Sequence, residues 1–173
     1  MPRDRRFVAV HRGGPLNRKK HRFLANWAAD CAEHLLWMFT ERSSDDRPRI
    51  AIDVARAWAR GEVPVGAAQK AAIGAHAAAR KVQDRAARAS ARAAGHAVAT
   101  AHMAEHCLGV VIYGARAIQA KGKSVDTERE WQLRRLPNNM RKLIESALER
   151  RLQMKGGREL RAKSSRKSKE RAG

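Results

Sequence analysis

Residues 102–106 read His-Met-Ala-Glu-His, a stretch that holds the residue types of a zinc site. On an ideal helix His102 and His106 are four residues apart and nearly aligned, which lets two imidazoles bind one metal ion. Glu105 could then serve as the general base for a metal-bound water. This chemistry is that of a zinc-dependent hydrolase.

A third protein ligand for such a metal is not evident. His96 lies six residues before His102, which is about 120° around a helix. The downstream carboxylates belong to no distinctive motif: Glu128, Glu130, Glu145 and Glu149. We therefore predict no metal and no other cofactor, and we favour histidines that pack at a helix interface over a partner-binding surface. The zinc-dependent hydrolase remains an alternative.

Other catalytic motifs are not found in the sequence. It contains no Gly-rich phosphate loop, no Ser-His-Asp arrangement and no Cys-x-x-Cys pair. The run "DDRPR" at 45–49 is explained by helix capping and ion pairing, and the four tryptophans are spaced as core or rim residues of helices. The sequence therefore predicts a protein that is not an enzyme.

Alanine is the residue that sets the fold class. It occupies 33 of 173 positions, and together with Leu, Met, Arg, Lys and Gln it makes a chain of strong helix formers. Tyr, Phe and Thr, which favour strands, are scarce. We predict an all-α fold, a single compact bundle of six or seven helices with Ala-rich helices at its centre.

Capping residues divide the chain into these helices. After a short extended N-terminal segment at "FVAV", Asn17 is predicted to cap a helix that runs to about Arg42. Asp45 or Asp46 begins the next helix, and Gly61 ends it. Ala-rich helices are expected over 66–81, 84–105 and about 108–121, with Gly109 and Gly114 as points where the last could break or bend. Ser124 or Asp126 then caps a helix that ends near Pro137, and Asn138 caps the last one.

The net charge of +20 is concentrated at the two ends of the chain. Residues 1–22 carry +7 and residues 155–173 carry +6, which leaves +7 for the body. The stretch 155–173 has no apolar stripe, so we predict a helical domain over 1–154 followed by a basic disordered tail. Basic ends neutralise phosphates without reading sequence, so weak, non-specific nucleic-acid binding is expected. A basic helical nucleic-acid-binding protein is a further alternative.

The apolar residues favour a cytoplasmic protein. Cys31 and Cys107 are far apart in apolar helical stretches, which is typical of free thiols in a reducing compartment. No run of 18 apolar residues occurs, and the N-terminal apolar run is too short for a signal peptide. We expect no membrane partner.

Four blocks carry a resemblance to a known family: "RDRRFVAVHRGGPL" at 3–16, "DDRPRIAIDVARAWARGE" at 45–62, "AAGHAVATAHMAEHCLG" at 93–109 and "REWQLRRLP" at 129–137. In these blocks the chain resembles the Imm-5-like putative immunity proteins of bacterial toxin–immunity systems. The resemblance implies an all-helical binder of a cognate protein toxin. A basic surface would suit an acidic toxin.

The resemblance also implies candidate partner-binding residues. The polar residues that the resemblance carries over to this sequence are Asp46, Arg47, Arg56, His96, His102 and His106. We expect these side chains to form a polar centre where three segments meet, with Arg47 and Arg56 as the first residues to test.

Overall fold

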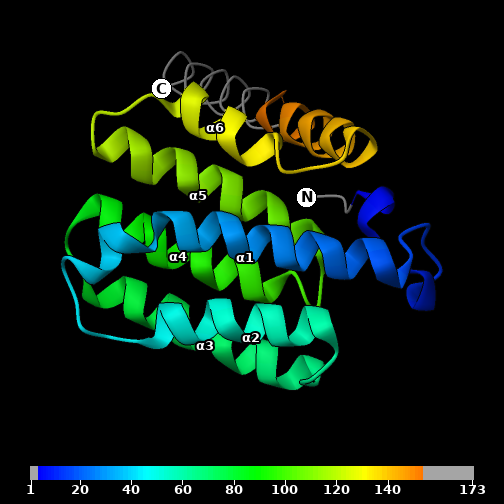
Figure 1. The fold of residues 1–173 in the computed structure, drawn as a ribbon, viewed down its shortest axis with the longest axis horizontal. Coiled ribbons are helices and arrows are strands. Elements are labelled where there is room, and N and C mark those ends of the chain that lie inside the picture. Colours follow the sequence, from blue (N-terminus) through cyan, green and yellow to red (C-terminus); the bar gives the residue numbers. More distant parts are fainter. Residues whose placement is uncertain (1–3, 154–173) are drawn as a thin grey trace, which may run out of the picture. The chain divides into compact units, whose positions relative to one another are not determined.

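The computed structural model describes residues 4–153, and the chain divides into two units, Met1–Leu136 and Pro137–Gly173 (Figure 1). The described residues contain helices and one isolated β-bridge, between Ala9 and Leu16. The prediction of an all-α fold is therefore confirmed. The predicted disordered tail, 155–173, lies outside the described residues.

The described residues of the first unit, 4–136, form six α-helices and three short 3₁₀ helices. The α-helices are α1 (Arg18–Thr40), α2 (Arg47–Arg60), α3 (Val65–Lys81), α4 (Arg85–Ala99), α5 (Cys107–Ala120) and α6 (Val125–Leu133). The 3₁₀ helices are η1 (Arg5–Phe7), η2 (Val10–Arg12) and η3 (Ala104–His106). In the second unit the described residues form one helix over 138–153.

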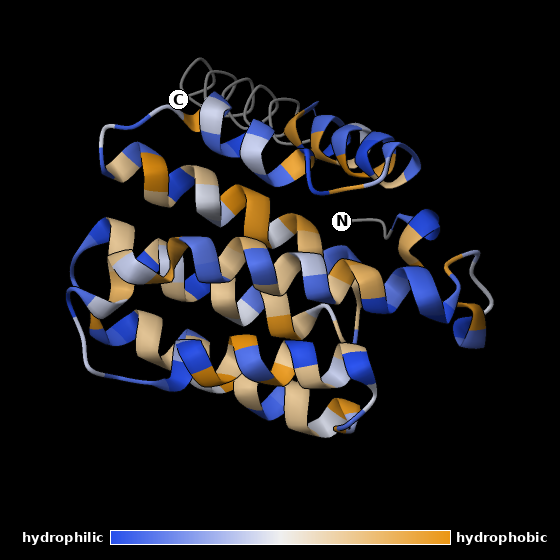
Figure 2. Cartoon of the chain, in the orientation of Figure 1, coloured by the Kyte–Doolittle hydropathy of each residue, from blue (hydrophilic) through white to orange (hydrophobic). Residues whose placement is uncertain are grey.

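Helix α4 lies at the centre of the first unit. It packs against α1, α3 and α5, and also against α2 (Figure 1). Its buried face is built almost wholly from small residues, among them Ala87, Ala91 and Ala94, each fully buried. Small side chains let neighbouring helix backbones approach closely. Figure 2 shows hydrophilic and apolar residues interspersed along the helices of this unit.

Three of the predicted helix boundaries are set by the expected residues. The Asn17 side chain accepts a hydrogen bond from the Lys20 backbone N–H at 2.8 Å, and Ser124 accepts one from Thr127 at 3.2 Å. Gly61 ends α2 with φ of +90°, a left-handed conformation that costs glycine little. The predicted cap of the last helix, Asn138, is wrong by one position. The Pro137 carbonyl accepts from the backbone N–H groups of Met140 and Arg141, so Pro137 is the N-cap residue and Asn138 is the first residue of the helix.

The N-terminal segment folds as part of the first unit. Of the predicted extended stretch "FVAV", Val8 and Ala9 are extended, whereas Phe7 lies in η1 and Val10 lies in η2. The backbone N–H of Val10 donates to the Leu16 carbonyl at 2.9 Å, and the N–H of Leu16 donates to the Val8 carbonyl at 3.0 Å. Phe7 and Leu16 are buried. Residues 4–16 are therefore a packed segment of the fold.

The predicted helix over 84–105 is wrong at its C-terminal end, because α4 ends at Ala99. The Thr100 hydroxyl donates to the His96 carbonyl at 3.1 Å, and the Thr100 carbonyl accepts from His21 Nε2 at 2.7 Å. In a continuing helix that carbonyl would accept from the N–H of Ala104. The chain instead turns through residues 100–103 into η3 and α5.

None of the helices within residues 4–153 is both long enough and apolar enough to cross a bilayer. Cys31 and Cys107 are fully buried, and neither forms a disulfide. Burial in apolar surroundings raises the pKa of the Cys31 thiol well above its ordinary value, with a smaller contribution from the Glu128 carboxylate. Cys31 is therefore a packing residue rather than a nucleophile.

Candidate functional site

Four histidines of the first unit form a continuous cluster. The ring centroids of His76 and His96 are 5.3 Å apart, those of His96 and His106 are 5.4 Å apart, and those of His106 and His102 are 4.9 Å apart. Tyr113 stacks on His96 with a centroid distance of 5.1 Å. The structure therefore brings together the three predicted histidines, and adds His76 from α3 and Tyr113 from α5.

Two glycines make room for the rings of this cluster. A Cβ atom built on Gly95 would lie 2.5 Å from Cε1 of His76, and one built on Gly109 would overlap the ring of His96. Each imidazole thus lies directly against the backbone of the neighbouring helix. Gly109 does not break α5, nor does Gly114. In the sequence, a glycine inside an otherwise Ala-rich helix was the available signal for such a close approach.

Burial determines the protonation state of His76, one member of this cluster. Desolvation is the main cause that lowers the pKa of His76 below its ordinary value, and the nearby Arg92 and Arg80 lower it further. His76 is therefore neutral at pH 7.

The His-x-x-Glu-His stretch does not form the helix that the zinc hypothesis requires. His102 lies in the turn after α4, and Glu105 and His106 lie in η3. Among residues 4–153, no group of three or more His, Cys, Asp or Glu side chains is arranged to hold a metal ion. The expectation of a metal-free protein remains a prediction.

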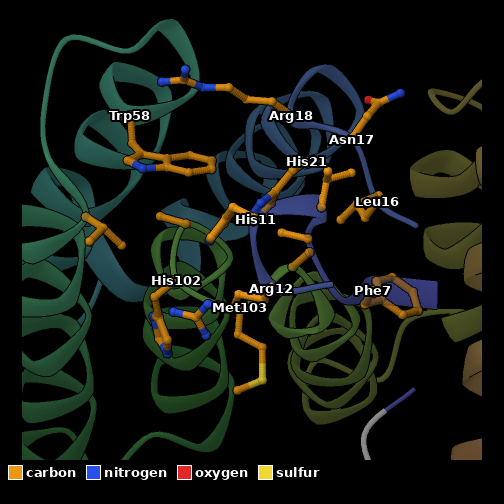
Figure 3. A pocket seen from close by; sticks show the side chains of 15 residues that line it. Phe7, His11, Arg12, Leu16, Asn17, Arg18, His21, Trp58, His102 and Met103 are labelled. Carbon is orange, nitrogen blue, oxygen red and sulfur yellow. The ribbon is translucent and has the colours of Figure 1, made fainter. Parts of the chain in front are cut away.

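A cavity of about 610 Å³ lies beside His102 (Figure 3). It is lined by the N-terminal segment, the ends of α1, α2 and α3, and the turn that follows α4. Its apolar lining includes Phe7, Leu16, Trp58 and Met103, and its basic lining includes His11, Arg12 and Arg18. Such a cavity is suited to an apolar side chain with a carboxylate nearby.

His21, which lines this cavity, contacts two other segments of its wall. It bonds to the Thr100 carbonyl and packs against the indole of Trp58, with ring centroids 4.9 Å apart. Burial lowers the pKa of His21, although the hydrogen bond to Thr100 acts in the opposite direction. His21 links α1, α2 and the end of α4, and sequence reasoning did not single it out.

A second hollow, of about 790 Å³, lies on α4 and α5. Its lining includes Tyr113, Gln119 and four arginines. The arginines are Arg85, Arg88, Arg92 and Arg116. We call it the arginine groove. Tyr113 connects it to the histidine cluster, because the ring that stacks on His96 also contacts the Arg116 guanidinium at 4.9 Å.

The predicted site residues on α2 have separate partners. Arg56 binds Asp30 at 2.7 Å and Glu33 at 2.6 Å, so it ties α2 to α1. Arg47 pairs with Asp45 at 2.8 Å. Asp46 is the N-cap residue of α2, but its side chain forms no capping hydrogen bond. Arg47 and Arg56 thus already have carboxylate partners within the fold.

These features describe an all-α protein whose hollows are suited to binding. The sequence model for the Imm-5 like putative immunity protein family matches residues 14–139, so the chain belongs to this family. The matched range includes α1 to α6 and the whole histidine cluster. Comparisons with curated proteins and with solved structures found no significant match. The family description points to a non-enzymatic role.

Proposed function

We propose that this chain is an immunity protein that binds one cognate bacterial toxin stoichiometrically and blocks its active surface in the cytoplasm. The family match over residues 14–139 is the observation that carries this proposal. The fold is consistent with it, because α4 is held on several sides by closely packed helices and so gives a rigid framework for surface side chains.

Inhibition by occlusion needs complementary surface rather than reactive groups. Affinity in such interfaces comes from a few well-packed anchors, while opposite charges speed association and select the partner. The cavity beside Trp58 offers a place for an apolar anchor, and the arginine groove offers positive charge. An acidic toxin is therefore the partner that fits this chain.

The chain's basic charge also favours a second candidate, a nucleic-acid-binding protein. With +7 in residues 1–22 and +6 in residues 155–173, the ends would bind phosphates in a salt-dependent way. Such binding is non-specific and gives no role to the histidine cluster or to the cavity. We therefore rank it below toxin binding.

The test is co-expression with a candidate bacterial toxin encoded by a neighbouring gene. The proposal expects survival with the chain present, a 1:1 complex by light scattering, and a toxin of unchanged mass that regains activity when the complex is separated. A modified or cleaved toxin would indicate an enzyme. Survival that is the same with and without this chain would rule out immunity.

A further inference from the structure

We propose that the arginine groove on α4 and α5 receives an acidic segment of the protein partner. This inference rests on the proposed function, because it names the surface and the chemistry by which the partner is held. Neither the arginines of the groove nor Tyr113 was among the site residues expected from the sequence.

Among the described residues, the four arginines have no acidic partner, in contrast to several other arginines. In the first unit, Arg6, Arg47, Arg56, Arg60, Arg129 and Arg134 each form an ion pair with an Asp or Glu. Within the described residues, no ion pair is found for Arg85, Arg88, Arg92 or Arg116. The groove therefore presents positive charge that the fold itself does not neutralise.

The sequence around the groove maintains this imbalance. Residues 85–125 contain six Lys or Arg and a single acidic residue, Glu105. Glu105 lies in η3, whereas the described residues that line the groove belong to α4 and α5. Because no carboxylate is among the described residues that line the groove, those residues attract an incoming acidic side chain without competing acids of their own.

The guanidinium groups are held on a rigid support. Arg85, Arg88 and Arg92 are spaced by three and four residues, so they lie along one face of α4. Arg88 donates to the Val82 carbonyl at 2.9 and 3.1 Å, and Arg116 lies over the Tyr113 ring. Pre-ordered side chains lose less conformational entropy when a partner binds.

A protein carboxylate fits this groove better than a nucleic acid does. Guanidinium groups bind carboxylates and phosphates alike through two parallel hydrogen bonds, so the arginines by themselves suit both ligands and the other residues of the groove decide. Single-stranded nucleic acids usually also need an aromatic ring on which a base can stack. Tyr113, the aromatic residue that lines the groove, already stacks on His96 and contacts Arg116. A hollow of about 790 Å³ is a suitable size for a short loop or helical turn bearing a few acidic side chains.

The direct test uses a fluorescent Glu-rich peptide of roughly 12 residues and the full-length chain. The groove variant carries Arg85→Glu, Arg92→Glu and Arg116→Glu. The matched control carries Lys19→Glu, Arg49→Glu and Lys70→Glu, three exposed cations outside the groove, so both variants undergo the same change in net charge. Unchanged far-ultraviolet dichroism confirms that both variants fold.

We expect the groove variant to bind the peptide at least about tenfold more weakly than the wild type, since a repelling charge opposes each acidic side chain. The control should bind within about twofold of the wild type. The measurement is made at physiological salt, which screens the general effect of the changed net charge. Equal losses in the two variants would overturn the inference. So would duplex DNA that displaces the peptide from the groove at physiological salt.

The same variants in the toxin co-expression assay separate this inference from the proposed function. Loss of protection in the groove variant alone supports both. Full protection by both variants overturns the groove as the contact surface and leaves immunity in place. If the wild type itself gives no protection, immunity fails, and the peptide measurement still decides whether the groove binds acidic protein segments.

Discussion

His21 Nε2 lies 2.7 Å from the carbonyl oxygen of Thr100, and this contact joins the start of α1 to the end of α4. Both residues are buried, so neither group can replace the bond with water. The contact occupies the carbonyl that a longer α4 would need. It therefore fixes the turn in which His102 lies, and with it the wall of the cavity shown in Figure 3.

The substitution His21→Ala should destabilise the fold by about 2–4 kcal/mol, because it leaves a buried carbonyl without a donor and removes packing against Trp58. Urea unfolding measures this change. The matched control is His11→Ala, an exposed histidine that lines the same cavity, which should change stability by less than about 0.5 kcal/mol. Equal effects of the two substitutions would contradict the role given to His21.

Stability should fall as the pH drops below about 6.5, the ordinary pKa of histidine. The pKa values of His21 and His76 are lowered by burial in the folded protein, so the unfolded chain binds protons more readily than the folded one. This histidine contribution is present above the unfolded pKa and is lost as pH falls through the folded values.

Urea midpoints measured from about pH 7.5 down to 5 follow this loss. The pKa values of Glu33 and Asp45 are also lowered, chiefly by hydrogen bonds from Arg56 and Arg47, but these carboxyls start from ordinary values of 4.5 and 3.8. The effect of these two carboxyls on stability therefore occurs at a more acidic pH than the effect of the histidines. A His76→Gln variant should show a shallower pH dependence, and an unchanged slope would contradict the assignment.

The fold class and several helix boundaries could be predicted from the sequence because they depend on local residues. Asn17, Ser124 and Gly61 act on backbone groups within a few positions of themselves. The end of α4 could not be predicted in this way, since it depends on His21, which is 79 residues away from Thr100.

The candidate site was predictable only in part for the same reason. His96, His102 and His106 stand close together in the sequence, whereas His76 joins them from another helix and belongs to no motif. The spacing of Arg85, Arg88 and Arg92 is visible in the sequence, but the groove requires α5 beside α4. Packing decides which charges face a hollow.

Gly109→Ala should destabilise the protein by about 1–3 kcal/mol, although alanine is the better helix former. The added Cβ would overlap the His96 ring, and that ring is confined by its own cluster. Gly66→Ala in α3 is the control, because a Cβ there meets open space, and it should stabilise by about 0.5 kcal/mol. Thermal or urea unfolding measures the stability of both variants. A stabilised Gly109→Ala protein would contradict the close approach of the His96 ring to Gly109.

Protein purified without an affinity tag should contain no stoichiometric zinc. His102 and His106 are not on one continuous helix, and within residues 4–153 no group of three or more His, Cys, Asp or Glu side chains is arranged to hold a metal ion. Elemental analysis measures the metal content directly. One zinc per chain that disappears in a His102→Ala variant would bring the hydrolase alternative back to first place.

Removal of residues 154–173 should leave toxin protection largely unchanged and weaken DNA binding. The tail lies outside the family match and carries +6 in residues 155–173, so its contribution to DNA affinity is electrostatic and steeply salt-dependent. Residues 1–22 must be kept in this variant, because Phe7, Leu16 and His21 are buried in the fold. Their positive charge is instead reduced by Lys19→Gln and Lys20→Gln, two exposed side chains.

The measurement is fluorescence anisotropy with a duplex DNA at several salt concentrations. The expected result is weak binding by the full chain, a smaller salt slope after tail removal, and a further decrease when Lys19 and Lys20 are neutralised. Protection against the toxin should persist throughout, since α4, α5 and the cavity are intact. DNA binding that stays tight at physiological salt after both changes would favour the nucleic-acid function over immunity.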